Sequence, residues 1–256
     1  MRYARQRAIT DLVGSDVVSV EDLATRLGVS TATIRRDLAT LSRAGLLTRV
    51  HGGAAPWNGS EVDRPFEVVA DDASEAKDEI ARAASELVDD GDVVLLDIGT
   101  TTRALARRLR GRPITVVTPS LAVLDELRDD ESVELVLLGG TLRRRYHSLV
   151  GTLTEDSLRQ VRGRIAFLGT SGVRGADVLD TTSVEVGTKR GLLAAAEQVV
   201  LLADHTKFPG RGSLRVCGLA DVDVLVTDTP PTDDLRSVLE EHGTRSHHPS
   251  TPPRHP

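Results

Sequence analysis

The sequence contains a single cysteine, Cys217, among its 256 residues. One cysteine cannot form a disulfide within the chain, which excludes the disulfide-stapled scaffolds of small secreted proteins. Paired Cys or His spacings typical of zinc sites are also missing, so we expect no bound metal and no other cofactor. A reducing, cytoplasmic location fits this composition.

Long apolar runs are absent as well. The N-terminus begins with charged residues and develops no apolar signal-peptide core. No run approaches the roughly 20 residues that a membrane-spanning helix needs. We therefore expect a protein that is not exported and has no membrane partner. No internal repeat of domain size is present either.

The chain as a whole lacks an excess of positive charge, since its formal net charge is −6. Residues 1 to 55 nevertheless carry eight arginines against five acidic residues, which gives +3 and leaves −9 for the remainder. The basic N-terminal end is therefore the candidate for binding a polyanion. The length of the chain favours two domains over one.

Residues 1 to 55 show the pattern of a winged helix-turn-helix. Apolar residues at helical spacing predict three helices, and a short β-ribbon follows them. Ser19 and Gly28 are placed as the N-cap and the C-terminal stop of the second helix. The predicted segments are residues 3–13, 20–27 and 31–42 for the helices and 46–51 for the ribbon.

The third predicted helix carries side chains suited to reading DNA. Short polar residues at its start could contact phosphates, and Arg35 and Arg36 could reach phosphate or guanine one turn later. Asp37 could instead neutralise these arginines and leave a solvated helix face. The candidate residues for binding double-stranded DNA are Ser30, Thr31, Thr33, Arg35 and Arg36 on the helix, and Arg49 and His51 on the ribbon.

Residues 74 to 232 alternate helical stretches with apolar β-branched runs. This rhythm predicts an α/β domain with a buried, mostly parallel sheet. Residues 56 to 73 mix proline, glycine and acidic residues and are predicted to be a linker. Residues 233 to 256 form a C-terminal extension that we expect to be disordered from residue 244, where Pro, Ser and His prevail.

Polar residues follow several predicted strands of this domain. Gly99 to Thr102 lie at a strand end and a helix start, where free N–H groups and the helix dipole favour an anion; a helix cap without a ligand is the alternative. Asp204 and Lys207 follow another strand, as a sugar-binding pair or as a surface ion pair. The candidate ligand-binding residues are Asp97, Gly99, Thr100, Thr101, Thr102, Thr118, Gly139, Gly140, Asp204 and Lys207.

Two charged groups are ambiguous. The arginine run at residues 143 to 145 could hold a phosphate, contact DNA, form oligomer contacts or remain solvated. Glu185 and Lys189 lie one turn apart on a predicted helix, so an ion pair within the helix is expected for them, and a ligand role for either is the alternative.

The N-terminal motifs resemble the signature of DeoR-type transcription regulators. The motifs are Val20-Glu-Asp-Leu-Ala, Val29-Ser-Thr-Ala-Thr-Ile-Arg-Arg-Asp-Leu and Gly45-Leu-Leu-Thr-Arg-Val-His-Gly-Gly-Ala. The resemblance extends through the ligand-binding candidates and covers roughly residues 2 to 230. It implies a homo-oligomeric repressor of carbohydrate catabolism genes, which leaves its operator DNA when a phosphorylated sugar accumulates.

For the C-terminal domain, the resemblance implies a fold similar to ribose-5-phosphate isomerase. It also implies that Gly99 to Thr102 hold the phosphate and that Asp204 and Lys207 hold the sugar. The resembling isomerases place a catalytic Glu directly before a helix Lys. If Lys189 is that Lys, Thr188 precedes it and cannot act as a base, so we expect no enzyme activity. Two alternatives stay open: a domain that only oligomerises, and a sugar-phosphate isomerase.

Overall fold

The computed structural model of the chain describes residues 2–13, 17–43, 47–50, 52–55 and 66–249. The chain divides into two compact units, residues 1–69 and 70–256, and each has its own hydrophobic core. Residues 56–65 of the predicted linker lie outside the described residues. The rest of that segment includes a short helix, α4 (Phe66–Asp71).

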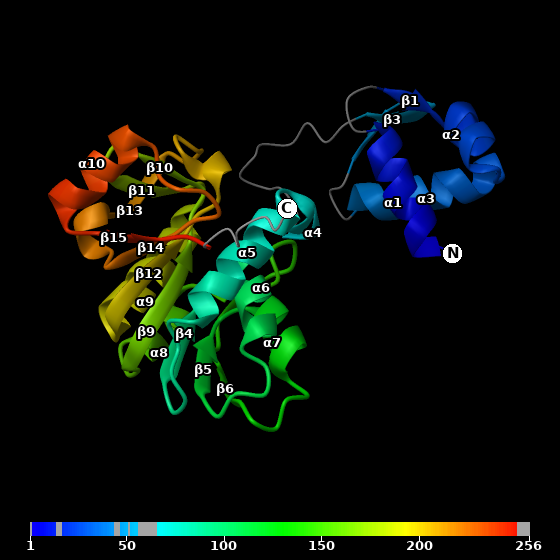
Figure 1. Cartoon of the computed structure of the whole chain (residues 1–256). Coiled ribbons are helices and arrows are strands. Elements are labelled where there is room, and N and C mark those ends of the chain that lie inside the picture. Colours follow the sequence, from blue (N-terminus) through cyan, green and yellow to red (C-terminus); the bar gives the residue numbers. More distant parts are fainter. Residues whose placement is uncertain (1, 14–16, 44–46, 51, 56–65, 250–256) are drawn as a thin grey trace, which may run out of the picture. The chain divides into compact units, whose positions relative to one another are not determined.

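The first unit is a winged helix-turn-helix (Figure 1). Its helices are α1 (Arg2–Val13), α2 (Val20–Leu27) and α3 (Thr31–Arg43). Strands β1 (Val18–Ser19), β2 (Thr48–Val50) and β3 (Gly53–Ala55) pair antiparallel in the order β1-β3-β2. The buried side chains of Ile9, Leu23, Ile34 and Leu38 hold the helices together.

Local signals set the ends of α2 as the sequence predicted. The Ser19 hydroxyl accepts a hydrogen bond from the Asp22 amide at 3.0 Å. Gly28 has a left-handed backbone, with φ of 62°, and its N–H donates to the carbonyls of Ala24 and Thr25. A serine cap therefore begins α2, and a left-handed glycine ends it at the turn that leads to α3.

The second unit is built on a parallel sheet, as predicted. The sheet has seven strands among the described residues, in the order β15-β14-β12-β9-β4-β5-β6. All neighbouring pairs in this sheet run parallel. The strands are β4 (Val93–Leu96), β5 (Thr115–Thr118), β6 (Glu134–Leu137), β9 (Gly163–Gly169), β12 (Ala196–Leu202), β14 (Val224–Val226) and β15 (Arg245–His247).

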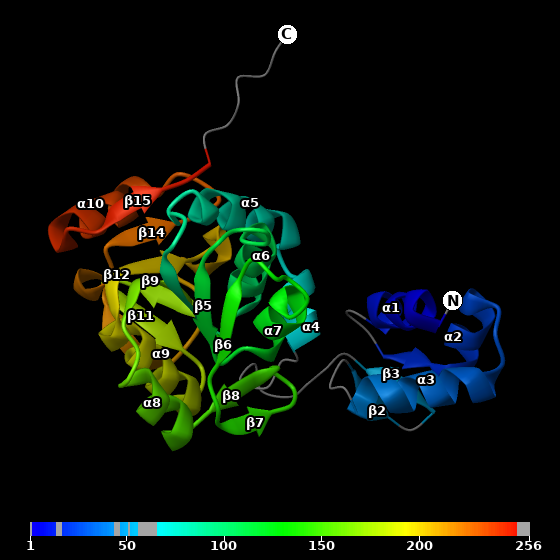
Figure 2. The same ribbon diagram turned by 90° about the horizontal axis from the view of Figure 1, so that it is seen from below.

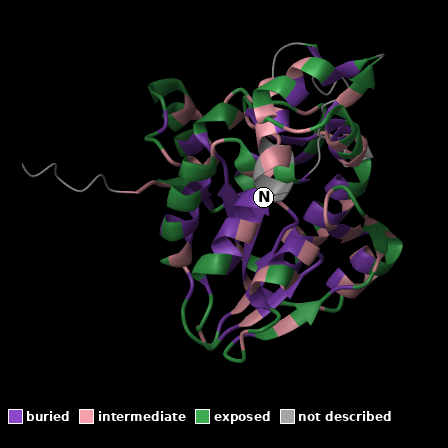
Figure 3. Ribbon diagram, turned by 90° about the vertical axis from the view of Figure 1, so that its right-hand side faces the viewer, coloured by how far each residue is buried: buried purple, intermediate pink, exposed green. Residues whose placement is uncertain are grey.

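Helices cover both faces of the sheet (Figure 2). Because strand side chains alternate between faces, Leu96 packs in the core formed with one set of helices and Leu95 in the other. The first set is α5 (Ser74–Ser85), α6 (Thr100–Arg108) and α7 (Leu121–Leu127), and the second is α8 (Thr152–Leu158), α9 (Ser183–Ala195) and α10 (Asp233–His242). Figure 3 shows buried residues concentrated along the strands.

Two small antiparallel elements add to this layer arrangement. The hairpin of β7 (Thr141–Arg143) and β8 (Ser148–Val150) follows β6 and leads into α8. A second sheet, in the order β10-β11-β13, consists of β10 (Gly172–Arg174), β11 (Asp177–Asp180) and β13 (Leu214–Gly218). The hairpin and β11 both bring polar residues toward α9, as the contacts below show.

The C-terminal extension is more ordered than the sequence predicted. Disorder was expected from residue 244, but Arg245–His247 form the edge strand β15 beside β14. Backbone hydrogen bonds hold this strand: the Arg245 amide donates to Asp223 at 3.0 Å, and His247 accepts from Thr227 at 3.1 Å. The strand lacks apolar side chains, so its sequence gives no strand signal. Residues 250–256 lie outside the described residues.

Candidate functional site

The start of α3 carries short polar side chains, as predicted. The Ser30 hydroxyl accepts from the Thr33 amide at 3.2 Å and lies 2.9 Å from the Thr33 hydroxyl. Ser30 and Thr31 are exposed, and Thr33 is half-buried. Ser30 therefore caps the helix, while Thr31 keeps its side chain toward solvent.

Arg35 and Arg36 form an exposed basic pair one turn further along α3. The expectation that Asp37 could neutralise them is wrong, because Asp37 is buried and faces α1. Its carboxylate accepts hydrogen bonds from Arg5 at 2.7 Å and from Gln6 at 3.1 Å. Within the part of the chain that the structure describes, neither Arg35 nor Arg36 has an ion-pair partner.

The β-ribbon presents a further arginine. Arg49 lies in β2, opposite Ala54 of β3, and is exposed. His51, the other residue predicted on the ribbon, lies outside the described residues. The ribbon joins α2 through a hydrogen bond of 2.9 Å from the Val20 amide to the Gly52 carbonyl.

In the second unit, most of the predicted ligand-binding residues lie along the carboxyl edge of the sheet. Asp97 directly follows β4, Thr118 ends β5, and Asp204 comes two residues after β12. Strands β4 and β9 are neighbours, and the chain leaves them toward opposite edges of the sheet. Ligands of open α/β sheets bind at such a switch point.

The first turn of α6 begins at this point. Gly99 is its N-cap and, having no side chain, provides no side-chain cap to the amides that follow. Thr100, Thr101 and Thr102 are all buried. The Thr102 hydroxyl donates to the carbonyls of Asp97 and Gly99, at 2.8 and 2.7 Å, and so fixes the loop. The turn has the features of an anion site: N–H groups, a helix dipole and a glycine without a side chain.

A buried lysine from α9 reaches the same edge. Lys189 Nζ bonds the Asp97 carboxylate, donates to the Gly169 carbonyl at 2.7 Å and lies 3.5 Å from Asp180 Oδ2. Burial alone would lower the pKa of Lys189, but Asp97, Asp180 and Glu185 together raise it above its ordinary value. Lys189 therefore carries its charge at neutral pH.

The intrahelical ion pair expected between Glu185 and Lys189 is wrong. Glu185 instead bonds Arg143 of the β7–β8 hairpin, whose guanidinium lies 5.1 Å from the centre of the Tyr146 ring. Burial and the neighbouring Asp180 raise the pKa of Glu185 to about 7. Of the three arginines at residues 143 to 145, Arg143 thus forms an ion pair with α9, while residues 144 and 145 are exposed.

Thr118 has a mainly structural role. Its buried hydroxyl donates to the Leu96 carbonyl at 2.8 Å and accepts from the Ser120 amide at 3.1 Å. Ser120 in turn caps α7, since its hydroxyl accepts from the Val123 amide at 3.2 Å. These bonds tie the end of β5 to the end of β4.

Gly139 and Gly140 lie where the chain passes from β6 into the hairpin. The Thr154 hydroxyl donates to the Gly139 carbonyl at 2.7 Å. A Cβ atom on Gly140 would lie 2.9 Å from the Val150 carbonyl oxygen, whereas a Cβ on Gly139 would meet no atom within 4 Å. Close packing thus explains Gly140 without a ligand.

Asp204 is the N-cap of the short 3-10 helix η2 (His205–Lys207) after β12, and Lys207 is its last residue. The buried Asp204 carboxylate accepts from the Thr206 amide at 2.9 Å and from the Thr206 hydroxyl. Lys207 Nζ lies 3.9 Å from Asp204 Oδ2 and is partly exposed. Since β9 separates β12 from β4, this pair is one strand further from α6 than Gly169 is.

Sequence reasoning did not predict the contacts that Lys189, Asp180 and Arg143 make at this edge. Their contacts join segments far apart in the chain, and no local motif reveals such contacts. One signal was available: Lys189 shares the helical spacing of Val186 and Leu192, so a charge occupies an otherwise apolar stripe of α9.

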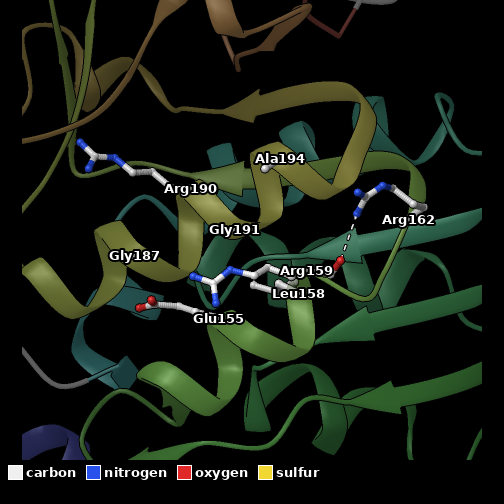
Figure 4. Close-up of a pocket in the computed structure, with 8 residues that line it drawn as sticks. All are labelled: Glu155, Leu158, Arg159, Arg162, Gly187, Arg190, Gly191 and Ala194. Atoms are coloured by element: carbon white, nitrogen blue, oxygen red, sulfur yellow. Dashed lines mark hydrogen bonds between the residues drawn. The ribbon is translucent and has the colours of Figure 1, made fainter.

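A groove of about 410 Å³ lies between α8 and α9 (Figure 4). Glu155, Arg159 and Arg162 line it together with Gly187 and Arg190, and the Arg162 guanidinium donates to the Arg159 carbonyl at 3.4 Å. Predicted ligand-binding residues do not line this groove.

Metal-ligand clusters of three or more His, Cys, Asp or Glu side chains are absent from the described residues. Among the same residues, no helix combines the length and apolarity needed to cross a membrane. Cys217 is buried, and burial raises the pKa of its thiol to about 11. Its thiol is therefore protonated at neutral pH.

Two family models match the chain, one for each unit. The DeoR-like helix-turn-helix domain matches residues 5–58. The DeoR C terminal sensor domain matches residues 72–229, which is more than half of the chain.

Several curated relatives match this chain over nearly its whole length. The glycerol-3-phosphate regulon repressor of Escherichia coli (strain K12) is 35% identical over 241 residues, covering 93% of this chain and 95% of the relative. The HTH-type transcriptional regulator GlpR of Haloferax volcanii is 37% identical, covering 93% and 94%. The HTH-type transcriptional repressor GlcR of Bacillus subtilis is 31% identical and covers 88% of both chains.

Among solved structures, ribose 5-phosphate isomerase A from Methanocaldococcus jannaschii is similar to this chain. It is 20% identical, with a TM-score of 0.39, and the match covers 52% of this chain and 54% of that one.

Proposed function

Because this chain belongs to the DeoR family of DNA-binding transcription regulators, we propose that it is a repressor whose sensor domain binds a phosphorylated sugar or polyol. Its relatives include a glycerol-3-phosphate regulon repressor and the repressor GlcR. The alternative of a second domain that only oligomerises is not favoured, since residues 72–229 match a sensor-domain model.

The DNA-binding part of the proposal is supported by α3 and the ribbon. Arg35 and Arg36 are exposed, and Asp37 is occupied by Arg5, so the two guanidinium groups can meet phosphates or guanine edges. Thr31 and Thr33 can donate to phosphates at the helix start. Arg49, and His51 from outside the described residues, would contact the backbone or the minor groove. We expect the protein to bind its operator as a homo-oligomer.

One observation carries the sensing part: the buried first turn of α6 begins at the switch point of the sheet. The amides of Thr100 and Thr101 suit the phosphate of an effector. Lys207 is placed after β12 to add a positive charge, and Asp204, three residues earlier, is placed to receive the sugar end. These roles complete the ligand-binding assignment that the sequence predicts for Gly99 to Thr102.

Binding without catalysis fits the same geometry. The residue directly before Lys189 is Thr188, whose hydroxyl donates to the Val184 carbonyl at 3.3 Å. Glu185, one turn away, is held by Arg143. An isomerase base must be free to take a proton from the substrate, and neither residue offers such a carboxylate. We therefore assign the domain a sensing role and no enzyme activity.

Calorimetric titration against a panel of sugar phosphates and polyol phosphates tests the proposal. Phosphorylated members should bind, and their unphosphorylated parents should not. Lys207→Ala should weaken binding, whereas Arg108→Ala, at the other end of α6, should leave it unchanged. A broad panel without binding, or equal binding of parent sugars, would contradict the sensing role.

A further inference from the structure

A closed series of contacts surrounds the switch point of the sheet. On one side, Asp97 bonds Lys189 of α9. One turn earlier on α9, Glu185 bonds Arg143 of the hairpin. Lys189 also lies 3.5 Å from Asp180, which ends β11. This half of the series links the end of β4 to the hairpin through α9.

The other half returns to β4 through the hairpin and β5. Arg143 is paired in register with Ser148, and Ser148 forms an isolated bridge with Ser120. The Ser120 amide donates to Thr118, whose hydroxyl donates to the carbonyl of Leu96, the residue before Asp97. We call this closed series the contact ring.

Three buried oxygens on or beside the contact ring have no hydrogen-bond partner among the described residues. They are Asp97 Oδ1, Ser148 Oγ and Thr182 Oγ1. Asp97 and Ser148 have no exposed surface, and Thr182 stands two residues after Asp180 at the N-cap of α9. Two other buried atoms lack hydrogen bonds, but each lies near a carboxylate: Arg164 pairs with Asp92, and His247 lies 4.0 Å from Glu86.

An unpartnered buried polar atom is costly, and most such atoms in proteins have a partner. Thr182 occupies a cap position without making a cap bond. Asp97 uses Oδ2 for Lys189 and for the Gly169 amide at 3.0 Å, which leaves Oδ1 unused. The three oxygens are therefore not explained by the folding of the domain.

From these atoms we infer that the contact ring is the hydroxyl-binding subsite of the sensor, with Asp97 Oδ1, Ser148 and Thr182 as its recognition groups. The inference rests on the proposed function, since it assumes that a phosphorylated effector binds at α6. It transfers recognition of the sugar end from Asp204, whose Oδ1 is already bonded to Thr206, to these three residues.

The chemistry of the subsite restricts the effector to one class. An ionised carboxylate only accepts hydrogen bonds, so Asp97 Oδ1 requires a donor. A phosphate dianion offers no donor and would be repelled. A hydroxyl donates to Asp97 and can also accept from Ser148 or Thr182. The effector must therefore be a phosphorylated polyol or sugar with a free hydroxyl near its phosphate, because Asp97 is two residues from the α6 cap.

Matched ligand pairs test this inference by calorimetry. Glycerol 3-phosphate is compared with propyl phosphate, and glucitol 6-phosphate with hexyl phosphate, on the full-length protein. Each alkyl phosphate keeps the phosphate and loses the hydroxyls. In at least one pair, the hydroxylated ligand should bind about 10-fold tighter or more, since several hydrogen bonds are lost at once.

Variants connect that preference to the named oxygens. Thr182→Val and Ser148→Ala should each reduce the ratio of the two affinities, hydroxylated ligand over alkyl phosphate, by about 2- to 10-fold. Neither change removes a hydrogen bond that the protein makes, so both variants should fold and should bind the alkyl phosphate as the wild type does. Thr152→Val, on the exposed start of α8, is the control and should change neither affinity.

The outcomes separate the inference from the proposed function. Equal affinities within each pair, or an unchanged ratio in both variants, would overturn the inference while leaving a phosphate sensor. If none of the four ligands binds, both the subsite inference and the proposed sensing function are overturned for this class of effector. Asp97→Asn would disturb the fold as well as the subsite, because Lys189 and Asp180 depend on that carboxylate for charge balance.

Discussion

The ammonium of Lys189 on α9 bonds the carboxylate of Asp97, which lies 92 positions earlier, after β4. Both groups are almost completely buried. The bond joins the helix on one face of the sheet to the switch point where α6 begins. It also places a positive charge beside the turn that we assign to the phosphate.

Replacing Lys189 should destabilise the domain strongly. Lys189→Met leaves the carboxylates of Asp97 and Asp180 buried without compensation, and we expect the free energy of unfolding to fall by about 3 to 5 kcal/mol. Urea denaturation followed by circular dichroism measures the change. Adding Asp97→Asn to the variant should recover part of the loss. A loss below about 1 kcal/mol would show that the pair is not buried as described.

The basic pair on α3 should control DNA affinity. Arg35→Ala and Arg36→Ala should each weaken binding to the DNA upstream of this protein's own gene by 10-fold or more, as expected for about 1 to 3 kcal/mol per base contact. An arginine that contacts a phosphate should also reduce the salt slope by about 0.9. Fluorescence anisotropy gives both quantities. Arg108→Ala is the charge-matched control, and an equal loss in that variant would assign the effect to net charge alone.

Glu185 should make stability depend on pH. Burial and Asp180 raise its pKa to about 7 in the folded protein, against 4.5 for the free group. The folded state keeps a proton that the unfolded chain releases, so stability is full below roughly pH 4.5 and falls as the pH rises toward 7. Arg143 and Lys189 moderate the shift. Compared with Glu185→Gln, the wild type should lose unfolding free energy between pH 5 and 7; a constant difference would contradict the shifted pKa.

Alanine substitutions at the two glycines after β6 should have very different effects on the free energy of unfolding. Gly140→Ala places a Cβ against the Val150 carbonyl, at a φ of 158°, and should lower the free energy of unfolding by about 1 to 3 kcal/mol. Gly139→Ala meets no atom within 4 Å and should have a much smaller effect. Thermal unfolding of the two variants compares them directly. Equal effects would show that the packing against β8 does not constrain Gly140.

Much of the fold was predictable because its signals are local. Helical spacing, Ser19 and Gly28 predicted the helix-turn-helix, and alternating apolar runs predicted the parallel sheet. The hairpin β7–β8 and the sheet β10-β11-β13 were not predicted, since their strands are short and their pairing is set by distant neighbours. Strand β15 is polar, and backbone hydrogen bonds pair it with β14.

In the candidate site as well, local sequence predicted some residues, and tertiary contacts determined the others. Gly99 to Thr102 were predictable from a glycine and three threonines between a strand and a helix. Lys189 and Arg143 were not, because the partner of each depends on how α9 and the hairpin fold against the sheet. An i,i+4 spacing favoured the pairing of Glu185 with Lys189, and stronger tertiary partners replaced it.

The central claim is that effector binding in the second unit releases DNA from the first. The direct test is anisotropy of a labelled DNA fragment from upstream of this protein's gene, titrated with the protein alone and with a saturating ligand from the calorimetric panel, such as glycerol 3-phosphate. A coupling free energy of typical size predicts that the dissociation constant for DNA rises roughly 5- to 150-fold. Unchanged DNA affinity, with the ligand shown to be bound, would contradict the account.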